Sequence, residues 1–316
     1  MRPVDRASVT VLVDNSVDVF LPNSDIARRP DRPWDPAPGI LRAEHGLSLL
    51  LRIAVDGRES SVLYDAALGR DTAVHNMDVL GAEPHDLRAI VLSHGHVDHY
   101  SGLEGVARRI GRAQLPLLLH PDARRDRKIV FPSGEELLTP PPSMNDLERE
   151  GVTVVEERGP TLLIDDAVLV TGEVERRTDF ERGFPLQYWR SPSGWEPDFA
   201  VEDDQAVIVN VRGHGLVVLS GCSHAGIVNI LRFAQRVTGV DRILAVIGGF
   251  HLTGPLFEPL ISRTIEELVA IAPQIIVPGH CTGWKAIHAI ARQLPAAYVQ
   301  TSVGTTFEFE GSHPVG

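Results

Sequence analysis

Three histidines and one aspartate fall within six residues of this chain, at His94, His96, Asp98 and His99. They directly follow an apolar run, residues 89–92, that is typical of a buried strand. In extended or turn geometry, residues two apart point to the same side, so His94 and His96 can bind one metal ion while Asp98 and His99 face a second. Grouping these side chains without a metal would cost desolvation free energy with no compensation. The spacing therefore predicts a two-metal site.

Isolated histidines elsewhere in the chain carry a weaker signal. A single histidine is more often a satisfied core or surface residue than a metal ligand. We interpret six histidines in this ordinary way: His75, His85, His120, His214, His288 and His313.

Several further motifs connect the histidine-rich loop with a known family. HGHVDH at 94–99 matches the pattern HxHxDH and resembles the metallo-β-lactamase superfamily. The order expected of that superfamily continues with LVVLSGCSH (216–224), ILAVIGGFH (243–251) and IIVPGH (275–280). A subgroup related to the dihydropterin ribofuranosylaminobenzene phosphate synthases of methanopterin biosynthesis is similar at EHGLS (44–48), GCSHAGIVN (221–229), GGFHL (248–252) and PGHCTG (278–283). The resemblance runs from about residue 10 to about residue 305 and is weakest between about 110 and 205.

The resemblance implies two sets of metal ligands on loops that follow successive strands. The first ion would be held by His94, His96 and His224. The second ion would be held by Asp98, His99 and His280. Cys222 stands where many relatives have an aspartate that bridges the two metals, and its thiolate would suit zinc. The alternative for Cys222 is a small buried hydrophobic residue behind His224.

Two residues are predicted to take part in catalysis, Asp98 and His251. Asp98 places a carboxylate at the metals, and a histidine corresponding to His251 assists proton transfer in some relatives, which makes His251 a candidate acid or base. Asp65 ends a strand where the superfamily commonly has an aspartate that supports the metal loop by hydrogen bonding rather than by ligation. A plain strand-terminal aspartate is the alternative. Glu173 stands near the place where many members supply a third histidine ligand, so the chain departs from the family pattern there.

Composition limits the classes of partner. The chain has 316 residues, of which 43% are hydrophobic and 23% charged, as in ordinary globular proteins. A net charge of −12 argues against nucleic-acid or anionic-membrane binding, while a local basic pocket would still accept a small anionic substrate. The two cysteines both lie in site motifs, and no apolar stretch approaches the roughly 18 residues of a membrane span. We therefore expect a cytoplasmic protein with a small-molecule substrate.

Strand blocks alternate with helices in two halves, each ending in site residues. This order predicts an α/β (α+β) fold, the four-layer αββα metallo-β-lactamase sandwich, with two mixed sheets face to face and helices outside. We expect one domain over 1–316, with an insertion or cap at about 121–205. Aromatic and arginine side chains of this cap could line a pocket for a flat, anionic ligand or simply pack the cap. They are Phe180, Phe184, Tyr188, Trp189, Trp195 and Phe199, with Arg176, Arg177, Arg182 and Arg190 among them.

These observations predict a metal-dependent hydrolase with two divalent ions, zinc first and iron or manganese as alternatives. A water between two such ions loses a proton near neutral pH and becomes the nucleophile. The expected substrate is a phosphoester of a small molecule, ahead of lactones and thioesters. The subgroup resemblance implies a different reaction as the alternative, a transferase that joins a dihydropterin to a ribosylated aminobenzoate phosphate. A third interpretation is a non-catalytic metal-binding member of the fold.

Overall fold

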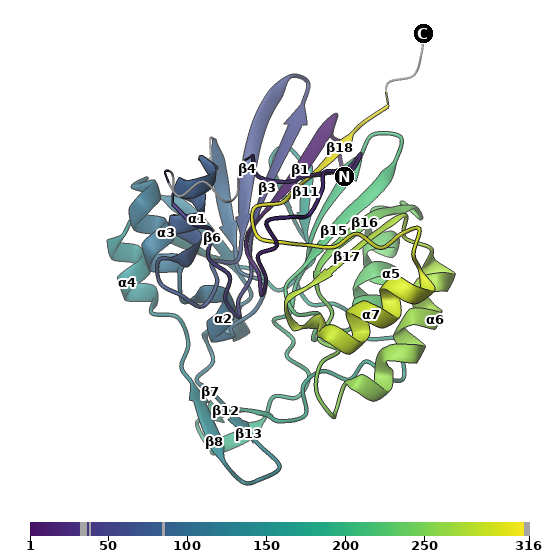
Figure 1. The fold of residues 1–316 in the computed structure, drawn as a ribbon. Coiled ribbons are helices and arrows are strands. Elements are labelled where there is room, and N and C mark those ends of the chain that lie inside the picture. Colours follow the sequence, from purple (N-terminus) through teal and green to yellow (C-terminus); the bar gives the residue numbers. More distant parts are fainter. Residues whose placement is uncertain (32–36, 38, 84–85, 313–316) are drawn as a thin grey trace.

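The computed structural model describes residues 1–31, 37, 39–83 and 86–312. Two of the histidines interpreted as ordinary, His85 and His313, lie outside the described residues. The described strands form sheets of eight, six and four strands. Figure 1 shows the two larger sheets facing one another, with helices on their outer sides.

The eight-stranded sheet has the order β2-β18-β1-β3-β4-β5-β6-β9. Its strands are β1 (Arg6–Val13), β2 (Ala27–Arg28), β3 (Ser48–Val55), β4 (Arg58–Tyr64), β5 (Leu87–Val91), β6 (Leu115–Leu119), β9 (Val152–Glu156) and β18 (Thr306–Glu310). Pairing is antiparallel from β1 to β4 and parallel from β4 to β9, so the sheet is mixed. Parallel neighbours need crossover connections. The crossovers contain the helices α1 (Thr72–Leu80), α2 (Val97–Tyr100), α3 (Leu103–Ile110) and α4 (Met144–Arg149).

The six-stranded sheet has the order β10-β11-β14-β15-β16-β17. Its strands are β10 (Thr161–Leu163), β11 (Val168–Val170), β14 (Val207–Val211), β15 (Gly215–Ser220), β16 (Ile243–Gly249) and β17 (Ile275–Gly279). Only β15, β16 and β17 run parallel. Two helices connect these parallel strands and a third follows them: α5 (Ile227–Thr238), α6 (Ile261–Ile271) and α7 (Trp284–Gln293).

Alternation along the strands sends side chains into three separate apolar clusters. In β3, Leu49 and Leu51 pack between the two sheets, whereas Leu50 packs on the outer side with α1 and α3. In β15, Val217 packs between the sheets and Val218 packs against the helices of the second half. Two sheets that are apolar on both faces must be covered by helices on the outside. The predicted four-layer αββα sandwich is confirmed.

A third, four-stranded sheet projects from the sandwich on the side of α2 (Figure 1). Its order is β13-β12-β7-β8, with β7 (Arg127–Val130), β8 (Glu136–Thr139), β12 (Gln187–Ser191) and β13 (Gly194–Pro197). We call this sheet the cap sheet. The predicted cap range of about 121–205 also contains β9, which belongs to the eight-stranded sheet, and β10 and β11, which belong to the six-stranded sheet. Part of that range is therefore built into the sandwich.

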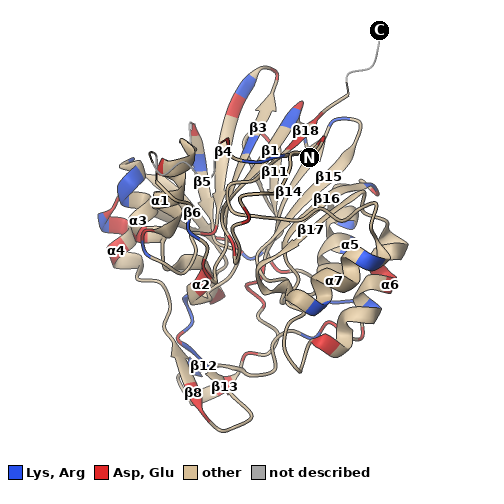
Figure 2. Ribbon diagram, viewed as in Figure 1, with Lys and Arg blue, Asp and Glu red and all other residues tan. Residues whose placement is uncertain are grey.

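Charged residues of both signs are interspersed on the outer helices and on the cap sheet in the view of Figure 2. Acidic residues outnumber basic ones, 42 to 30. Within the part of the chain that the structure describes, no helix has both the length and the apolar character that crossing a bilayer requires.

Candidate metal centre

The histidine-rich loop leaves the eight-stranded sheet at the end of β5. The N–H of Leu92 still donates to the Leu118 carbonyl, at 2.9 Å, and the chain then turns into α2. Gly95 lies in the turn, where a Cβ would approach the Ala123 carbonyl oxygen to 2.5 Å. Only glycine fits that close approach. The turn brings His94 and His96 to the same side, as their spacing predicts.

His94, His96 and His224 form the first group of candidate ligands, with one nitrogen of each within 4.8 Å of the others. His94 Nε2 lies 2.9 Å from His96 Nδ1, and His224 Nε2 lies 3.2 Å from that same Nδ1. Burial lowers the pKa of His94 well below its usual value and, with Arg127 nearby, lowers the pKa of His96 to about 4. The rings are therefore neutral near pH 7, and neutral imidazole is the form that binds metal.

Asp98, His99, Cys222 and His280 form the second group, again within 4.8 Å of one another. Cys222 Sγ lies 3.3 Å from His99 Nε2, and His280 Nε2 lies 3.3 Å from Asp98 Oδ2. Burial alone would lower the pKa of His99, but the Asp98 and Asp65 carboxylates outweigh it and raise that pKa to about 9. Burial alone would raise the pKa of Asp98, but the imidazoles of His99 and His280 hold it below its usual range. An oxygen, a thiol and two imidazoles make a donor set suited to zinc.

His251 belongs to a third, overlapping group with Cys222 and His224. Its ring lies 4.4 Å from that of His224 and 4.5 Å from that of Phe257, measured between centroids. The structure thus places the predicted acid or base directly beside the candidate ligands. The Phe184 ring also lies beside it, with centroids 5.4 Å apart.

Asp65 lies beneath the histidine-rich loop and contacts it twice. Its Oδ2 is 2.6 Å from His99 Nδ1, and its Oδ1 accepts the Ser93 N–H at 2.7 Å. Asp65 is fully buried. The contact with Nδ1 leaves His99 Nε2 as the nitrogen that faces Cys222 and Asp98, which is the arrangement that supports a metal-binding imidazole.

Several site residues have backbone in the left-handed region at the ends of their strands. They are Asp65 (φ 61°), Ser223 (φ 60°), His251 (φ 44°) and His280 (φ 48°). Positive φ is uncommon for residues other than glycine and concentrates at functional sites. Each turn directs the chain out of a sheet at the same edge of the sandwich.

Buried nitrogen atoms without hydrogen-bond partners test whether the site fits metal ions. Among the described residues, His224 Nδ1, His251 Nδ1 and both ring nitrogens of His280 are buried and unpartnered. The 3.3 Å contact of His280 Nε2 with Asp98 lacks hydrogen-bond geometry. Unsatisfied buried polar atoms are rare in folded proteins and need an explanation. Divalent ions would satisfy several of them at once, so the residues fit metal binding.

Four residues outside the predicted set of site residues contact the candidate ligands or the histidine-rich loop. His45 stacks on His280, with ring centroids 4.9 Å apart, and it belongs to the EHGLS motif that carries the subgroup resemblance. Asp14 accepts the His280 N–H at 2.8 Å. Gln187 and Asp203 reach the loop from the cap sheet and from the chain before β14. No local pattern marks the last two, because tertiary packing brings them to the loop.

Glu173 lies outside all three groups of candidate ligands. It contacts His120 Nε2 at 3.0 Å and Arg158 at 2.9 Å. The third imidazole of the first group comes instead from His224, on the loop after β15. Glu173 therefore does not take the place of the missing histidine.

The aromatic residues of the cap divide into two sets. Phe184 lies at the site, with its ring 6.1 Å from that of His96 and 5.7 Å from that of His224. Trp189 instead packs against the Arg125 guanidinium, and Trp195 packs against the cations of Lys128 and Arg190. Arg182, another residue of the predicted pocket, lines a small cavity together with His224 and His251. At the candidate ligands the predicted pocket for a flat, anionic ligand thus keeps Phe184 and Arg182.

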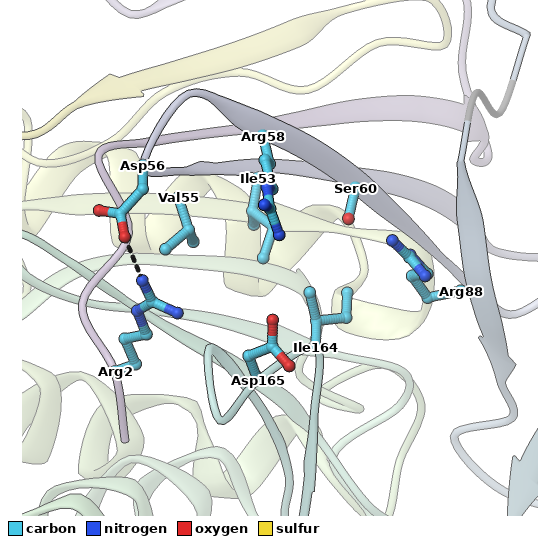
Figure 3. Close-up of a pocket in the computed structure, with 9 residues that line it drawn as sticks. All are labelled: Arg2, Ile53, Val55, Asp56, Arg58, Ser60, Arg88, Ile164 and Asp165. Atoms are coloured by element: carbon cyan, nitrogen blue, oxygen red, sulfur yellow. Dashed lines mark hydrogen bonds and ion pairs between the residues drawn. The ribbon is translucent and has the colours of Figure 1, made fainter.

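One cavity among the described residues lies away from the candidate ligands. It measures about 510 Å³ and adjoins the turn between β3 and β4 (Figure 3). Arg58 begins β4 and lines this cavity, whereas Asp65 follows the other end of the same strand. A cavity of about 310 Å³ does adjoin the site, where Asp14, His280 and Trp284 line it. Chemistry therefore identifies the site better than cavity size.

Sequence and structure comparisons agree with this architecture. The sequence profile described as the metallo-beta-lactamase superfamily matches residues 42–229. The chain belongs to the metallo-beta-lactamase superfamily. The superfamily binds divalent metal ions through this fold, and the groups above supply candidate ligands.

Three individual proteins show the extent of the similarity. The chain is 30% identical over 274 residues to 7,8-dihydropterin-6-methyl-4-(beta-D-ribofuranosyl)-aminobenzene-5'-phosphate synthase of Methanocaldococcus jannaschii, covering 84% of this chain and 90% of that protein. It is 27% identical over 252 residues to the uncharacterized protein MJ0448 of the same organism, covering 79% and 88%. The crystal structure of Tm1679, a metal-dependent hydrolase of the beta-lactamase superfamily, has the same fold, with a TM-score of 0.73 at 23% identity, covering 97% of this chain and 100% of that one. The predicted family resemblance is confirmed.

Proposed function

We propose that this protein is a metal-dependent hydrolase that acts on a phosphoester of a small, anionic molecule. One observation carries the proposal: two groups of ligand-type atoms, each within 4.8 Å, meet on a single loop that supplies His94, His96, Asp98 and His99. Two divalent ions would occupy these groups, zinc first, with iron or manganese as alternatives. When bound, such ions polarise a phosphoryl oxygen and lower the pKa of a bound water toward neutrality.

The residues of the chain divide the remaining work between them. His94, His96 and His224 would hold one ion. Asp98, His99, Cys222 and His280 would hold the other. Asp98 stays ionised because its pKa lies below the usual range, so it can also accept a hydrogen bond from the attacking water. His251, beside the ligands and packed against Phe184 and Phe257, would donate a proton to the leaving group.

A transferase is the second candidate, and one observation favours it. The curated relative that matches 84% of this chain is named as a synthase of a dihydropterin-linked ribofuranosylaminobenzene phosphate. In that reaction type the same residues would hold ions whose positive charge would stabilise a diphosphate leaving group, and the attacking group would be a second substrate instead of water. Shared superfamily membership does not decide between the two, because one fold hosts many reactions.

Elemental analysis of protein purified without chelator, together with ester hydrolysis, tests the proposal. About two ions per chain and turnover of a phosphomonoester or phosphodiester would support the hydrolase. Two ions without turnover of any phosphoester or lactone would favour the transferase. Absence of bound metal would overturn both. His96→Ala should remove turnover, and His214→Ala, in the turn between β14 and β15 and outside the groups of candidate ligands, serves as its control.

A further inference from the structure

We propose that Gln187 is a positioning residue that holds His96 with its proton on Nε2, leaving Nδ1 free to bind metal. The inference rests on the proposed function, because it concerns a ligand of the first ion. Gln187 is the first residue of β12, in the cap sheet, and it is fully buried. Its side-chain Oε1 contacts His96 Nε2 directly.

The orientation of the Gln187 amide follows from its second neighbour. Gln187 Nε2 lies 3.1 Å from Asp198 Oδ2. That carboxylate also accepts from Arg127 Nε at 2.8 Å and from Arg125 Nη1 at 2.7 Å. A carboxylate bound by two guanidinium groups only accepts hydrogen bonds, so the amide must present its NH₂ group to Asp198. Its oxygen then faces His96.

The amide oxygen of Gln187 decides the tautomer of His96. A carbonyl oxygen has no proton to donate, so His96 Nε2 must carry the hydrogen of that contact. The lone pair of the neutral ring is then on Nδ1. Nδ1 is the atom that lies 2.9 Å from His94 Nε2 and 3.2 Å from His224 Nε2. The opposite tautomer would direct a hydrogen atom into the group of ligands.

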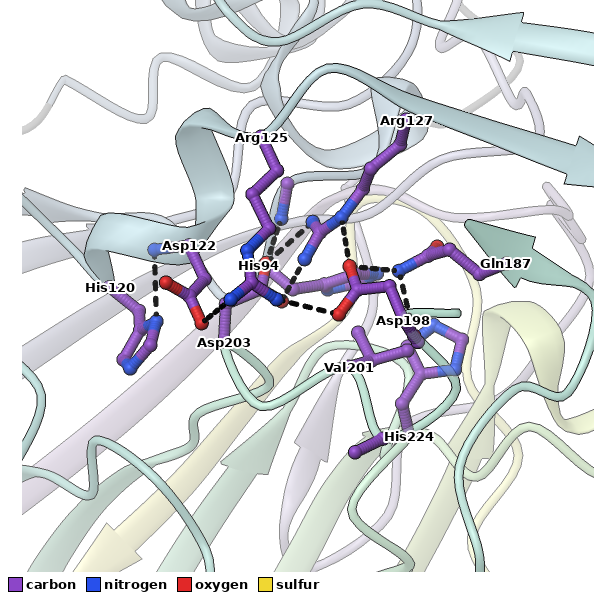
Figure 4. Close-up of polar contacts among 12 residues, drawn as sticks. His94, His120, Asp122, Arg125, Arg127, Gln187, Asp198, Val201, Asp203 and His224 are labelled. Carbon is purple, nitrogen blue, oxygen red and sulfur yellow. Dashed lines mark hydrogen bonds and ion pairs between the residues drawn. The ribbon is translucent and has the colours of Figure 1, made fainter. Parts of the chain in front are cut away.

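A second branch of the same network holds the backbone of the metal loop. Arg127, on β7 of the cap sheet, is fully buried and also donates to Asp203 Oδ2 at 2.9 Å. Asp203 Oδ2 in turn accepts the N–H of Gly95, between His94 and His96, at 2.8 Å. Figure 4 shows Arg127 between the two carboxylates and Gln187 beside Asp198. The cap sheet therefore contacts the histidine-rich loop in two ways. Gln187 contacts the His96 side chain directly, and Arg127 acts through Asp203 on the Gly95 N–H.

Proton–nitrogen correlation spectra of nitrogen-labelled, metal-free protein test the inference directly. At about pH 8 the His96 ring, whose pKa burial lowers to about 4, is neutral, and its protonated nitrogen can be identified. We expect the wild-type His96 signal, assigned by its absence in His96→Ala, to show a proton on Nε2. In Gln187→Met, which keeps the length of the side chain but removes the acceptor, we expect a mixture of tautomers. Wild-type protein with the proton on Nδ1 would overturn the inference without any variant.

Metal affinity gives a second readout. Gln187→Met should lower the affinity for the first zinc ion about 10- to 100-fold, measured by competition with a chelator. This is the usual effect of removing the hydrogen-bond partner of a histidine ligand. Ser191→Ala is the matched control, since Ser191 is buried on the same strand but bonds only within the cap sheet. An unchanged tautomer and affinity in Gln187→Met, or an equal loss in Ser191→Ala, would contradict the inference. If wild-type protein binds no zinc, the proposed function fails, whereas the tautomer measurement still decides the role of Gln187.

Discussion

The two halves of the candidate metal centre differ in how many of their ring nitrogens have partners within the protein. On the loop after β5, Ser93 Oγ lies 2.9 Å from His94 Nδ1, Gln187 contacts His96 Nε2, and Asp65 lies 2.6 Å from His99 Nδ1. On the loops of the six-stranded sheet, by contrast, the unpartnered buried nitrogens are those of His224, His251 and His280. Protein contacts therefore orient the histidine rings of the loop after β5. The rings on the loops of the six-stranded sheet lack contacts that a metal would supply.

This difference has a physical cause in the packing. The loop after β5 lies between the sandwich and the cap sheet, so its rings have protein on two sides. His224, His251 and His280 follow separate strands and turn out through left-handed backbone at or beside each residue. Hydrogen bonds to the second nitrogen orient a histidine ligand, and their absence leaves orientation to the metal. The loop after β5 should therefore be preorganised, and the other loops should become ordered when metal binds.

The largest expected effect compares one histidine from each half in metal-free protein. His99→Ala leaves the Asp65 carboxylate buried without its partner, and removing one member of a buried pair costs about 3–5 kcal/mol of unfolding free energy. His280→Ala also removes a buried ring, but the nitrogens of that ring have no hydrogen-bond partner, so it should cost about 1–3 kcal/mol less than His99→Ala. Urea denaturation in the presence of a chelator measures both. Equal losses would contradict the asymmetry between the halves.

Metal addition should stabilise the folded protein and act unevenly on the two halves. At a free zinc concentration about 100 times the dissociation constant, the unfolding free energy should rise by about 2.7 kcal/mol. Hydrogen exchange should slow more in residues 221–224, 249–252 and 279–282 than in residues 93–100. Calcium, which prefers oxygen ligands, serves as the control ion. Equal slowing in all four segments would show that the loop after β5 is not preorganised.

Asp65→Asn should lower the affinity for the second zinc ion about 10- to 100-fold, because it removes the carboxylate that orients His99.

The pH dependence of this zinc affinity should change as well. Burial alone would lower the pKa of His99, but the Asp98 and Asp65 carboxylates raise it to about 9. Below that pH zinc must displace a proton from His99, so the zinc affinity should increase with pH up to about pH 9. In the variant this increase should end at lower pH. Zinc titrations between about pH 6 and pH 9 measure it, and an unchanged profile would remove Asp65 from the role.

The parts of the site that sequence could predict are local in the chain. His94, His96, Asp98 and His99 reveal themselves by type and spacing, and His280 follows a recognisable apolar strand. The sandwich was predictable for the same reason, since its strands are long apolar runs between helices. Zinc, the number of ions and the role of Cys222 stay predictions.

The remaining contacts depend on long-range packing that no local pattern records. Gln187 and Asp203 reach the loop from positions 91 and 108 residues away in sequence. The predicted cap of about 121–205 overlapped the sandwich at β9, which has five residues, and at β10 and β11, which have only three residues each. Such short strands have too few positions to show a period. Glu173 stands near the place in the sequence where many superfamily members have a third histidine ligand. In the structure it is His224 that lies beside His94 and His96.

The smallest expected effect concerns Glu181, a buried carboxyl group between β11 and β12 that contacts the start of α5. Burial raises its pKa to about 7, although the N–H groups of Val228 and Asn229 at the start of α5 oppose the rise. Between about pH 4.5 and pH 7 the folded chain holds a proton that the unfolded chain has released, so stability falls as pH rises through this range. From about pH 5.5 to pH 6.5 the loss of unfolding free energy should be about 1 kcal/mol.

Glu181→Gln, which cannot titrate, should reduce this dependence of stability on pH. Part of the dependence should remain, because burial raises the pKa of Asp204 to about 7 as well. Denaturation curves at both pH values measure the difference, with the exposed Glu266→Gln as the control. A slope that is equal in wild type and Glu181→Gln would mean that the Val228 and Asn229 contacts at the helix N-terminus outweigh burial.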